Sequence, residues 1–248
     1  MMNNDVDFLK KRYKELANKS YSRNIPVFTN FLGLMEMSVF MEISKDISFA
    51  DFDIYGGAPD LERKVVRFGQ DTIPYPIDCI HITPSLKKFS DKLTHRDFLG
   101  ALINLGIERD YIGDIIVKDN EAFVFCINKM TNFITENLDR VKHTSVKCVI
   151  YTGEMDNISS DIKEIELNVA SLRLDVVIGE VYKLSRSQSQ TKIREGKAFV
   201  NGRLMENNSY QLKPADAITL RGYGRFIFSD TMGVSKKGRP YIKILLYI

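Results

Sequence analysis

Residues 184–203 read LSRSQSQTKIREGKAFVNGR, and this stretch decides how the C-terminal part of the chain folds. Ser185 can cap a short helix, and Gly196 stands where a left-handed residue commonly ends one. Asn201-Gly202 is the strongest hairpin signal in the chain. The stretch therefore predicts a short helix, a strand and a tight β-hairpin.

Cations and amides recur within this stretch at helical spacing. Side chains four residues apart stack on a helix, so Arg186, Gln190 and Arg194 are predicted to share one face. Lysines flank the helix and an arginine follows the turn: Lys183, Lys197 and Arg203. Arginine forks match phosphate oxygens bidentately, so the pattern predicts a surface complementary to a polyanion.

The distribution of charge also indicates a polyanionic partner. The chain carries a net charge of +3, but residues 171–248 hold 14 Lys and Arg against 6 Asp and Glu. That third is therefore +8, and residues 1–170 are −5. A basic third on an acidic body suggests contact with RNA, DNA or an anionic membrane, while the alternative is an uneven but solvated surface.

The residues around the basic stretch predict the rest of a small α+β domain. Residues 172–182 place apolar side chains on one helical face. The polar residues 154–168 are interpreted as a linker with one strand, at 164–169. The basic loop 233–240 is predicted to be a hairpin tip. Further strands are expected at residues 198–200, 217–221, 225–228 and 241–247.

The middle of the chain has a regular alternation of elements. Strands are expected at 77–83, 114–117, 122–127 and 146–151, with helices at 94–105 and 131–141. This β-α-β-β-α-β order is typical of a ferredoxin-like, RRM-like module. Phe123 and Phe125 share one face of a strand, where RRM domains stack bases. The interpretation we favour is that both face the two helices in the core.

The N-terminal residues predict a mixed α+β region. An amphipathic helix is expected at 5–18, a second helix at 28–40 and a short strand before the turn Gly56-Gly57. Pro74 and Pro76 mark a boundary near residue 75. The fold class is therefore predicted as α+β with three domains, at 1–75, 76–155 and 170–248, the last ending in a β-hairpin.

Composition argues against several classes of protein. With 44% hydrophobic and 27% charged residues, the profile is that of a globular protein. No apolar run reaches about 18 residues, so no membrane span is expected, and the charged first 19 residues predict no secretion signal. Three scattered cysteines indicate reduced thiols in a cytoplasmic protein, without a disulfide framework, metal site or cofactor.

The basic stretch resembles an S4 RNA-binding domain over about residues 172–222. The motif S-R-S-x-x-Q…I-R-x-G-K-x-x-V-N-G-R is followed by Ser209-Tyr210 and by PADAI at 214–218. Lys192 stands where many members have an apolar residue. The resemblance implies an RNA-docking surface made of Lys183, Ser185, Arg186, Gln190, Arg194, Lys197, Asn201, Arg203, Arg221 and Arg225.

Motifs outside this domain resemble bacterial YlmH-type S4 proteins. They are HRDFLGAL at 95–102, LGI at 105–107, IGDI at 112–115, Gly56-Gly57, ERK at 62–64 and RGYGRF at 221–226. The resemblance implies a cytoplasmic protein that binds structured RNA on the large ribosomal subunit, with rRNA as the main candidate and tRNA as an open second one. A monomer is expected. It further implies a role in the quality control of stalled subunits and a link to cell division.

Two other classes of function remain as alternatives. The first is an RNA-modifying enzyme, because Arg173-Leu174-Asp175 matches the R-L-D of pseudouridine synthases. The residues that follow differ from that site, so Asp175 is predicted to be a solvated helix carboxylate and no residue is predicted to be catalytic. The second is a protein adaptor of the division machinery.

Overall fold

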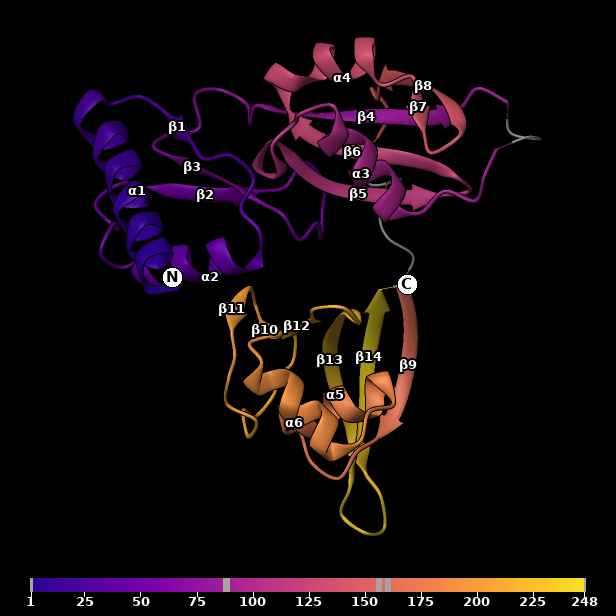
Figure 1. Cartoon of the computed structure of the whole chain (residues 1–248). Coiled ribbons are helices and arrows are strands. Elements are labelled where there is room, and N and C mark those ends of the chain that lie inside the picture. Colours follow the sequence, from indigo (N-terminus) through magenta and orange to yellow (C-terminus); the bar gives the residue numbers. More distant parts are fainter. Residues whose placement is uncertain (1, 87–89, 155–157, 159–161, 248) are drawn as a thin grey trace. The chain divides into compact units, whose positions relative to one another are not determined.

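The computed structural model describes residues 2–86, 90–154, 158 and 162–247. The chain forms two compact units, Met1–Ser159 and Ser160–Ile248. Both units combine helices with antiparallel sheets, which confirms the α+β class (Figure 1). The finer division into three domains stays a prediction. Among the described residues, no helix is both long and apolar enough to cross a membrane.

The first unit begins with two helices on a three-stranded sheet. The helices are α1 (Met2–Arg23) and α2 (Leu34–Ile43), and the sheet order is β1 (Val27–Phe28), β3 (Val65–Phe68), β2 (Phe52–Tyr55). Aromatic rings fill the space between them, with Phe40 edge-to-face on Tyr13 at 5.7 Å and on Phe68 at 6.0 Å. The predicted helix at 5–18 is confirmed and is longer at both ends.

The predicted helix at 28–40 is wrong in its first half. Phe28 lies in β1, where it pairs with Arg67, and the helix begins only after Gly33. The hydroxyl of Thr29 accepts a hydrogen bond from the Val66 amide at 2.9 Å, which holds this segment to β3. The apolar run is divided between a strand and a helix, and both elements bury their part of it. Hydrophobicity alone therefore does not show where the strand ends and the helix begins.

The middle of the first unit has the predicted β-α-β-β-α-β order. Its elements are β4 (Ile77–Pro84), α3 (His95–Asn104), β5 (Ile112–Lys118), β6 (Glu121–Ile127), α4 (Thr131–Asn137), β7 (Arg140–Val141) and β8 (Thr144–Ile150). Single 3₁₀ turns stand at Arg109–Tyr111 and Asn128–Met130. The antiparallel sheet has the order β5-β6-β4-β8-β7, so its first four strands follow the ferredoxin-like arrangement. Helix α4 stops at Asn137, before the predicted 141, because β7 pairs with β8.

Phe125 faces away from the helices, which corrects the prediction that it packs beneath them. It is fully buried in a cluster with Phe31, Leu61 and Val65 from the N-terminal part. Phe123 lies on the same face, half-buried, with its ring stacked on His81 at 4.4 Å. The helices instead cover the opposite face of the sheet, so each face of this sheet is buried in a cluster of its own.

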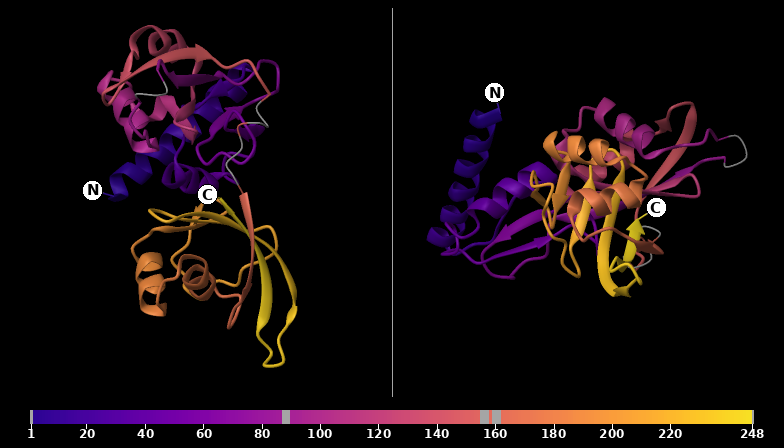
Figure 2. Two further views of the ribbon diagram at one scale, coloured as in Figure 1. Left: turned by 90° about the vertical axis from the view of Figure 1, so that its right-hand side faces the viewer. Right: turned by 90° about the horizontal axis from the view of Figure 1, so that it is seen from below.

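The second unit is a six-stranded antiparallel sheet covered on one face by two helices (Figure 2). The helices are α5 (Leu174–Tyr182) and α6 (Arg186–Arg194). The strands are β9 (Ile162–Asn168), β10 (Ala198–Val200), β11 (Arg203–Leu204), β12 (Ala217–Leu220), β13 (Gly224–Val234) and β14 (Pro240–Tyr247), in the order β11-β10-β12-β13-β14-β9. Ile178 and Ile193 from the helices meet Phe226, Phe228 and Ile244 in its core.

The edge strand β9 confirms the strand predicted at 164–169 and begins two residues earlier, within the segment interpreted as a linker. Residues 162–168 pair with β14 along its length, from Ile162 opposite Tyr247 to Asn168 opposite Tyr241. Ile165 and Leu167 turn toward the core, and polar side chains alternate with them. A polar edge strand resembles a linker in sequence because only one of its faces is buried and charged side chains protect its free edge.

Candidate nucleic-acid interface

Helix α6 is held by a cap and by close packing on α5. The Ser185 hydroxyl accepts a hydrogen bond from the Gln188 amide at 3.2 Å, and the Gln188 side chain accepts from the Ser185 amide at 2.8 Å. Ile193 is fully buried against the apolar side of α5. Gly179 on α5 lets the helices approach, since a Cβ there would lie 3.1 Å from the Ser189 hydroxyl. Ser185 thus has a structural role at the start of the helix.

Asn201 and Gly202 form the predicted tight turn between β10 and β11. Their φ angles are +52° and +74°, the left-handed region that Asn and Gly tolerate best. The Asn201 amide donates to Asp216 at 2.8 Å, and its oxygen accepts from the Ala217 amide at 2.9 Å. Both ends of this side chain are therefore engaged within the domain.

Gln190 lies against Asp175, in the interior side of α6. Its amide nitrogen donates to the Asp175 carboxylate at 2.8 Å, and Arg173 donates two hydrogen bonds to the same carboxylate at 3.0 and 2.9 Å. Asp175 is 1% exposed, so the prediction of a solvated carboxylate is wrong. Burial opposes its ionisation, but the hydrogen bonds from Arg173 and Gln190 outweigh burial and lower the pKa of Asp175.

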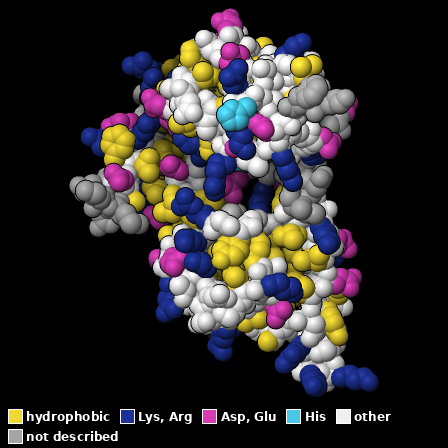
Figure 3. All heavy atoms as spheres, turned by 45° about the vertical axis from the view of Figure 1, so that its right-hand side comes forward, with side chains coloured by type: hydrophobic (Ala, Val, Ile, Leu, Met, Phe, Trp, Pro, Cys, Tyr) yellow, Lys and Arg dark blue, Asp and Glu magenta, His cyan; other side chains and the backbone are white. Residues whose placement is uncertain are grey.

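Four exposed arginines stand on the elements around β10. We call them the exposed arginines: Arg186 and Arg194 on α6, Arg203 on β11 and Arg221 after β12. Within the described residues, the ion pairs of the second unit involve other cations, namely Arg173, Lys192, Lys197 and Lys243. The Arg221 amide donates to the Lys197 carbonyl at 2.9 Å, which brings the end of α6 beside this turn. Figure 3 shows one face with Lys and Arg side chains distributed over both units.

The remaining predicted site residues differ in their surroundings. Lys183 is exposed and left-handed at the end of α5, with a φ of +54°. Lys197 pairs with Glu195 at 2.7 Å, and Lys192 pairs with the same carboxylate at 3.1 Å. Arg225 is half-buried and lies over the Tyr247 ring at 4.8 Å. Lys183 and the exposed arginines are thus accessible at the surface, whereas the side chains of Ser185, Gln190 and Asn201 form hydrogen bonds within the domain.

Tyr223 is a candidate contact that the sequence prediction missed. It is 44% exposed in the turn between β12 and β13, next to Tyr182 at 5.7 Å. The run Arg221-Gly222-Tyr223-Gly224-Arg225 alternates cations, glycines and an aromatic ring. This composition could have indicated Tyr223 as an RNA contact, because exposed rings beside arginines can stack on bases.

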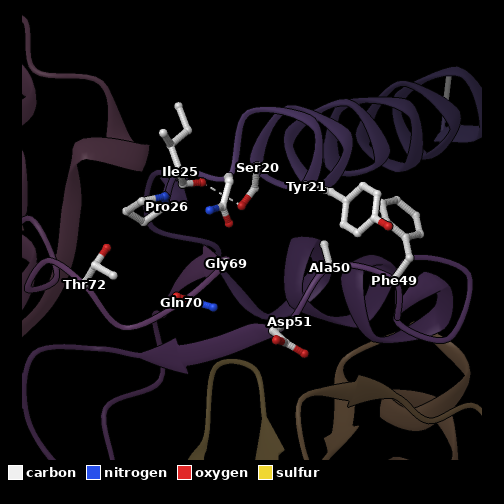
Figure 4. Close-up of a pocket in the computed structure, with 11 residues that line it drawn as sticks. Ser20, Tyr21, Ile25, Pro26, Phe49, Ala50, Asp51, Gly69, Gln70 and Thr72 are labelled. Carbon is white, nitrogen blue, oxygen red and sulfur yellow. Dashed lines mark hydrogen bonds between the residues drawn. The ribbon is translucent and has the colours of Figure 1, made fainter.

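A pocket in the first unit lies away from these residues along the chain. Its volume is about 220 Å³, and its lining includes Tyr21 and Phe49, whose rings meet edge-to-face at 5.5 Å (Figure 4). Ser20 also lines it, but its hydroxyl donates to the Ile25 carbonyl at 2.8 Å. Among the described residues, no group of three or more His, Cys, Asp or Glu is arranged to hold a metal.

Comparisons with known proteins found a matching family and a similar protein. Residues 74–153 match a family described as "Putative RNA-binding domain in YlmH". The chain is also 26% identical over 234 residues to the "Ribosome-associated protein quality control protein P2" of Bacillus subtilis (strain 168), covering 92% of this chain and 88% of that protein.

A solved structure is similar as well. It is the "Cell division protein ylmH from Streptococcus pneumoniae", with a TM-score of 0.48 and 21% identity over 59% of this chain and 91% of that one. The matched family region spans β4 to β8 of the first unit, and the B. subtilis relative is aligned along nearly the full length. The family match and this alignment support the resemblance of the chain to YlmH-type RNA-binding proteins.

Proposed function

We propose that the chain is a non-catalytic RNA-binding protein of the ribosome, and that the exposed arginines dock its second unit on structured RNA. The observation that carries the proposal is a set of four exposed arginines: Arg186 and Arg194 on the capped helix α6, Arg203 on the paired strand β11 and Arg221 in the turn after β12. The description of the matched family and the name of the B. subtilis relative support RNA and the ribosome as partners.

The chemistry of this surface suits phosphate groups. Each guanidinium offers a planar fork of donors to phosphate oxygens. The scaffold residues Ser185, Gln190 and Asn201 fix the elements that carry the arginines, so their spacing is set before RNA arrives. Phosphate contacts would set the affinity, and the arrangement of the cations would set the choice of site.

The proposed partner is the large ribosomal subunit, with rRNA as the main contact and tRNA as a second one. We further propose that the protein acts as a monomer in the cytoplasm during quality control of stalled subunits. The competing enzyme of the pseudouridine synthase kind would need a free carboxylate in its R-L-D motif. In this chain Asp175 is buried and held by Arg173 and Gln190, which favours a binding role.

The test is a charge reversal of two exposed arginines. We expect Arg186→Glu with Arg194→Glu to abolish co-sedimentation with purified large subunits while the thermal unfolding midpoint stays within a few degrees of that of the wild type. The control is Lys11→Glu with Lys14→Glu on α1, which changes the net charge equally at exposed positions of the first unit.

The salt dependence of binding gives a second readout. About five phosphate contacts at this surface alone would make log K fall with log salt with a slope of order −3 to −5. If the arginine double variant sediments with subunits as well as the wild type does, the proposed docking surface is wrong.

A further inference from the structure

The hairpin of β13 and β14 extends beyond the part of the sheet that carries the exposed arginines. Strand β12 pairs with β13 from Gly224 to Ile227, whereas pairing with β14 continues to Val234 opposite Pro240. At about 3.3 Å per residue, the seven residues after Ile227 carry the chain about 23 Å past the last rung shared with β12. Figures 1 and 2 show this hairpin as the long ribbon of the second unit. We call residues 231–241 the arm.

The end of the arm has a defined conformation. The Ser235 amide donates to the Arg239 carbonyl at 2.7 Å, and the Arg239 amide donates to the Ser235 hydroxyl at 3.1 Å. Gly238 takes a φ of +73° and donates to the Ser235 carbonyl at 2.8 Å. Asn168 on β9 also donates to the Arg239 carbonyl, at 3.3 Å. The backbone of the loop therefore forms a closed, hydrogen-bonded turn.

The arm itself carries cations and no acidic residue, and the nearest acidic residue in the sequence is Asp230, just before it. Residues 231–248 contain four Lys and Arg and no Asp or Glu. One of the four, Lys243, pairs with Glu164 on β9 at 2.8 Å. The other three, Lys236, Lys237 and Arg239, are exposed on the closing turn. Three cations within four residues repel one another, and a bound polyanion would relieve this repulsion.

Exposed apolar side chains accompany these cations. Val234 is 69% exposed, Met232 46% and Tyr241 43%. All three lie within seven residues of the charged turn, so an occupant of the arm meets both positive charge and apolar surface. The sugar and base of a nucleotide offer apolar surface beside phosphate, which matches this combination.

We propose that the arm is a second RNA contact, at which Lys236, Lys237 and Arg239 bind backbone phosphates and Tyr241 packs on a nucleotide. The inference rests on the proposed function, because it takes RNA as the partner. Both contacts belong to the second unit, so RNA held by the exposed arginines presents further phosphates to the arm at high effective concentration. RNA is favoured over a lipid surface because one extended polyanion can reach both sets of cations.

The first experiment removes the charges of the arm. We expect Lys236→Ala, Lys237→Ala and Arg239→Ala together to weaken binding to purified large subunits about tenfold or more at 0.1 M salt. The slope of log K against log salt should become shallower by about 2 to 3, because each lost phosphate contact removes about 0.7–0.9. The matched control is Lys11→Ala, Arg12→Ala and Lys19→Ala, two lysines and an arginine exposed on α1.

The second experiment locates the contact. An iron chelate tethered at Lys237→Cys should cleave rRNA at nucleotides different from those cleaved from Arg203→Cys. Absence of cleavage from position 237, or an arm variant with wild-type affinity and slope, would overturn the arm as an RNA contact. A third experiment measures binding to vesicles with 30% phosphatidylserine. If the arm variant loses vesicle binding but binds subunits like the wild type, the arm would be assigned to membranes instead.

These outcomes separate the two proposals. If the arm variant binds like the wild type while the Arg186→Glu, Arg194→Glu variant does not bind, only the arm proposal fails. If the wild type itself does not bind purified large subunits, the proposed function fails.

Discussion

The amide of Gln190 donates a hydrogen bond to the carboxylate of Asp175 at 2.8 Å, across the contact between α6 and α5. The helix therefore uses the middle residue of its Arg186, Gln190, Arg194 series to hold its own position. The two arginines on either side remain exposed. The series thus separates into one residue that supports the scaffold and two that are available to a ligand.

This separation predicts that two alanine substitutions affect different properties, one the stability of the fold and the other the binding of RNA. Gln190→Ala should lower the free energy of unfolding by about 1–3 kcal/mol, because it removes a hydrogen bond to a buried charged group. Arg194→Ala should leave stability within about 0.5 kcal/mol and weaken binding to large subunits, because the side chain is exposed. Denaturant unfolding and sedimentation measure the two effects, and a binding defect without a stability defect in Gln190→Ala would contradict the assignment.

The same carboxylate predicts a pH dependence of stability. The pKa of Asp175 is lowered in the folded state from its ordinary value of 3.8. Its ionised form therefore stabilises the fold above about pH 4, and this contribution is lost as the pH falls through the lowered pKa. Asp175→Asn should be less stable than the wild type at pH 7, and the difference should shrink at acidic pH. Equal slopes of stability against pH for both proteins would exclude this linkage.

Removing the negative charge of Glu195 should strengthen RNA binding. It pairs with Lys197 and Lys192 at the end of α6, and the hydrogen bonds from Lys197 and Lys192 lower its pKa. Glu195→Gln should raise affinity for large subunits about two- to fivefold, because an exposed ion pair is worth at most about 1 kcal/mol. Glu180→Gln, on exposed α5 surface, makes the same change in net charge and serves as the control. Similar gains in both variants would indicate a general charge effect.

Alanine substitutions at two glycines should change the stability of the first unit in opposite directions. A Cβ at Gly113 would lie 2.8 Å from ring carbons of Phe31 and 2.9 Å from the Phe125 Cβ, so Gly113→Ala should destabilise by about 1–3 kcal/mol. Gly100 lies in α3 with nothing within 4 Å of such a Cβ, so Gly100→Ala should stabilise by about 0.5–1 kcal/mol. Thermal unfolding of the two variants checks the signs, and a neutral Gly113→Ala would contradict the close packing of the first unit.

Local signals in the sequence determined several features correctly. The helix expected at 94–105 forms as α3, where Thr94 and Asp97 make a capping box, and Asn201-Gly202 forms the expected turn. The β-α-β-β-α-β order of the first unit is also as predicted. These features depend on residues close together in the chain, where capping, turn formation and periodicity act before any tertiary contact.

Tertiary structure decided what covers each surface. Alternation along β6 places Phe125 on one face of the strand, but only folding shows that the N-terminal residues, and not the helices, bury it. Helical spacing groups Gln190 with two arginines, but only the packing of α6 on α5 turns its amide toward Asp175. Local rules fix the direction of a side chain relative to its own element, whereas its partner comes from a distant segment whose placement depends on packing the whole unit.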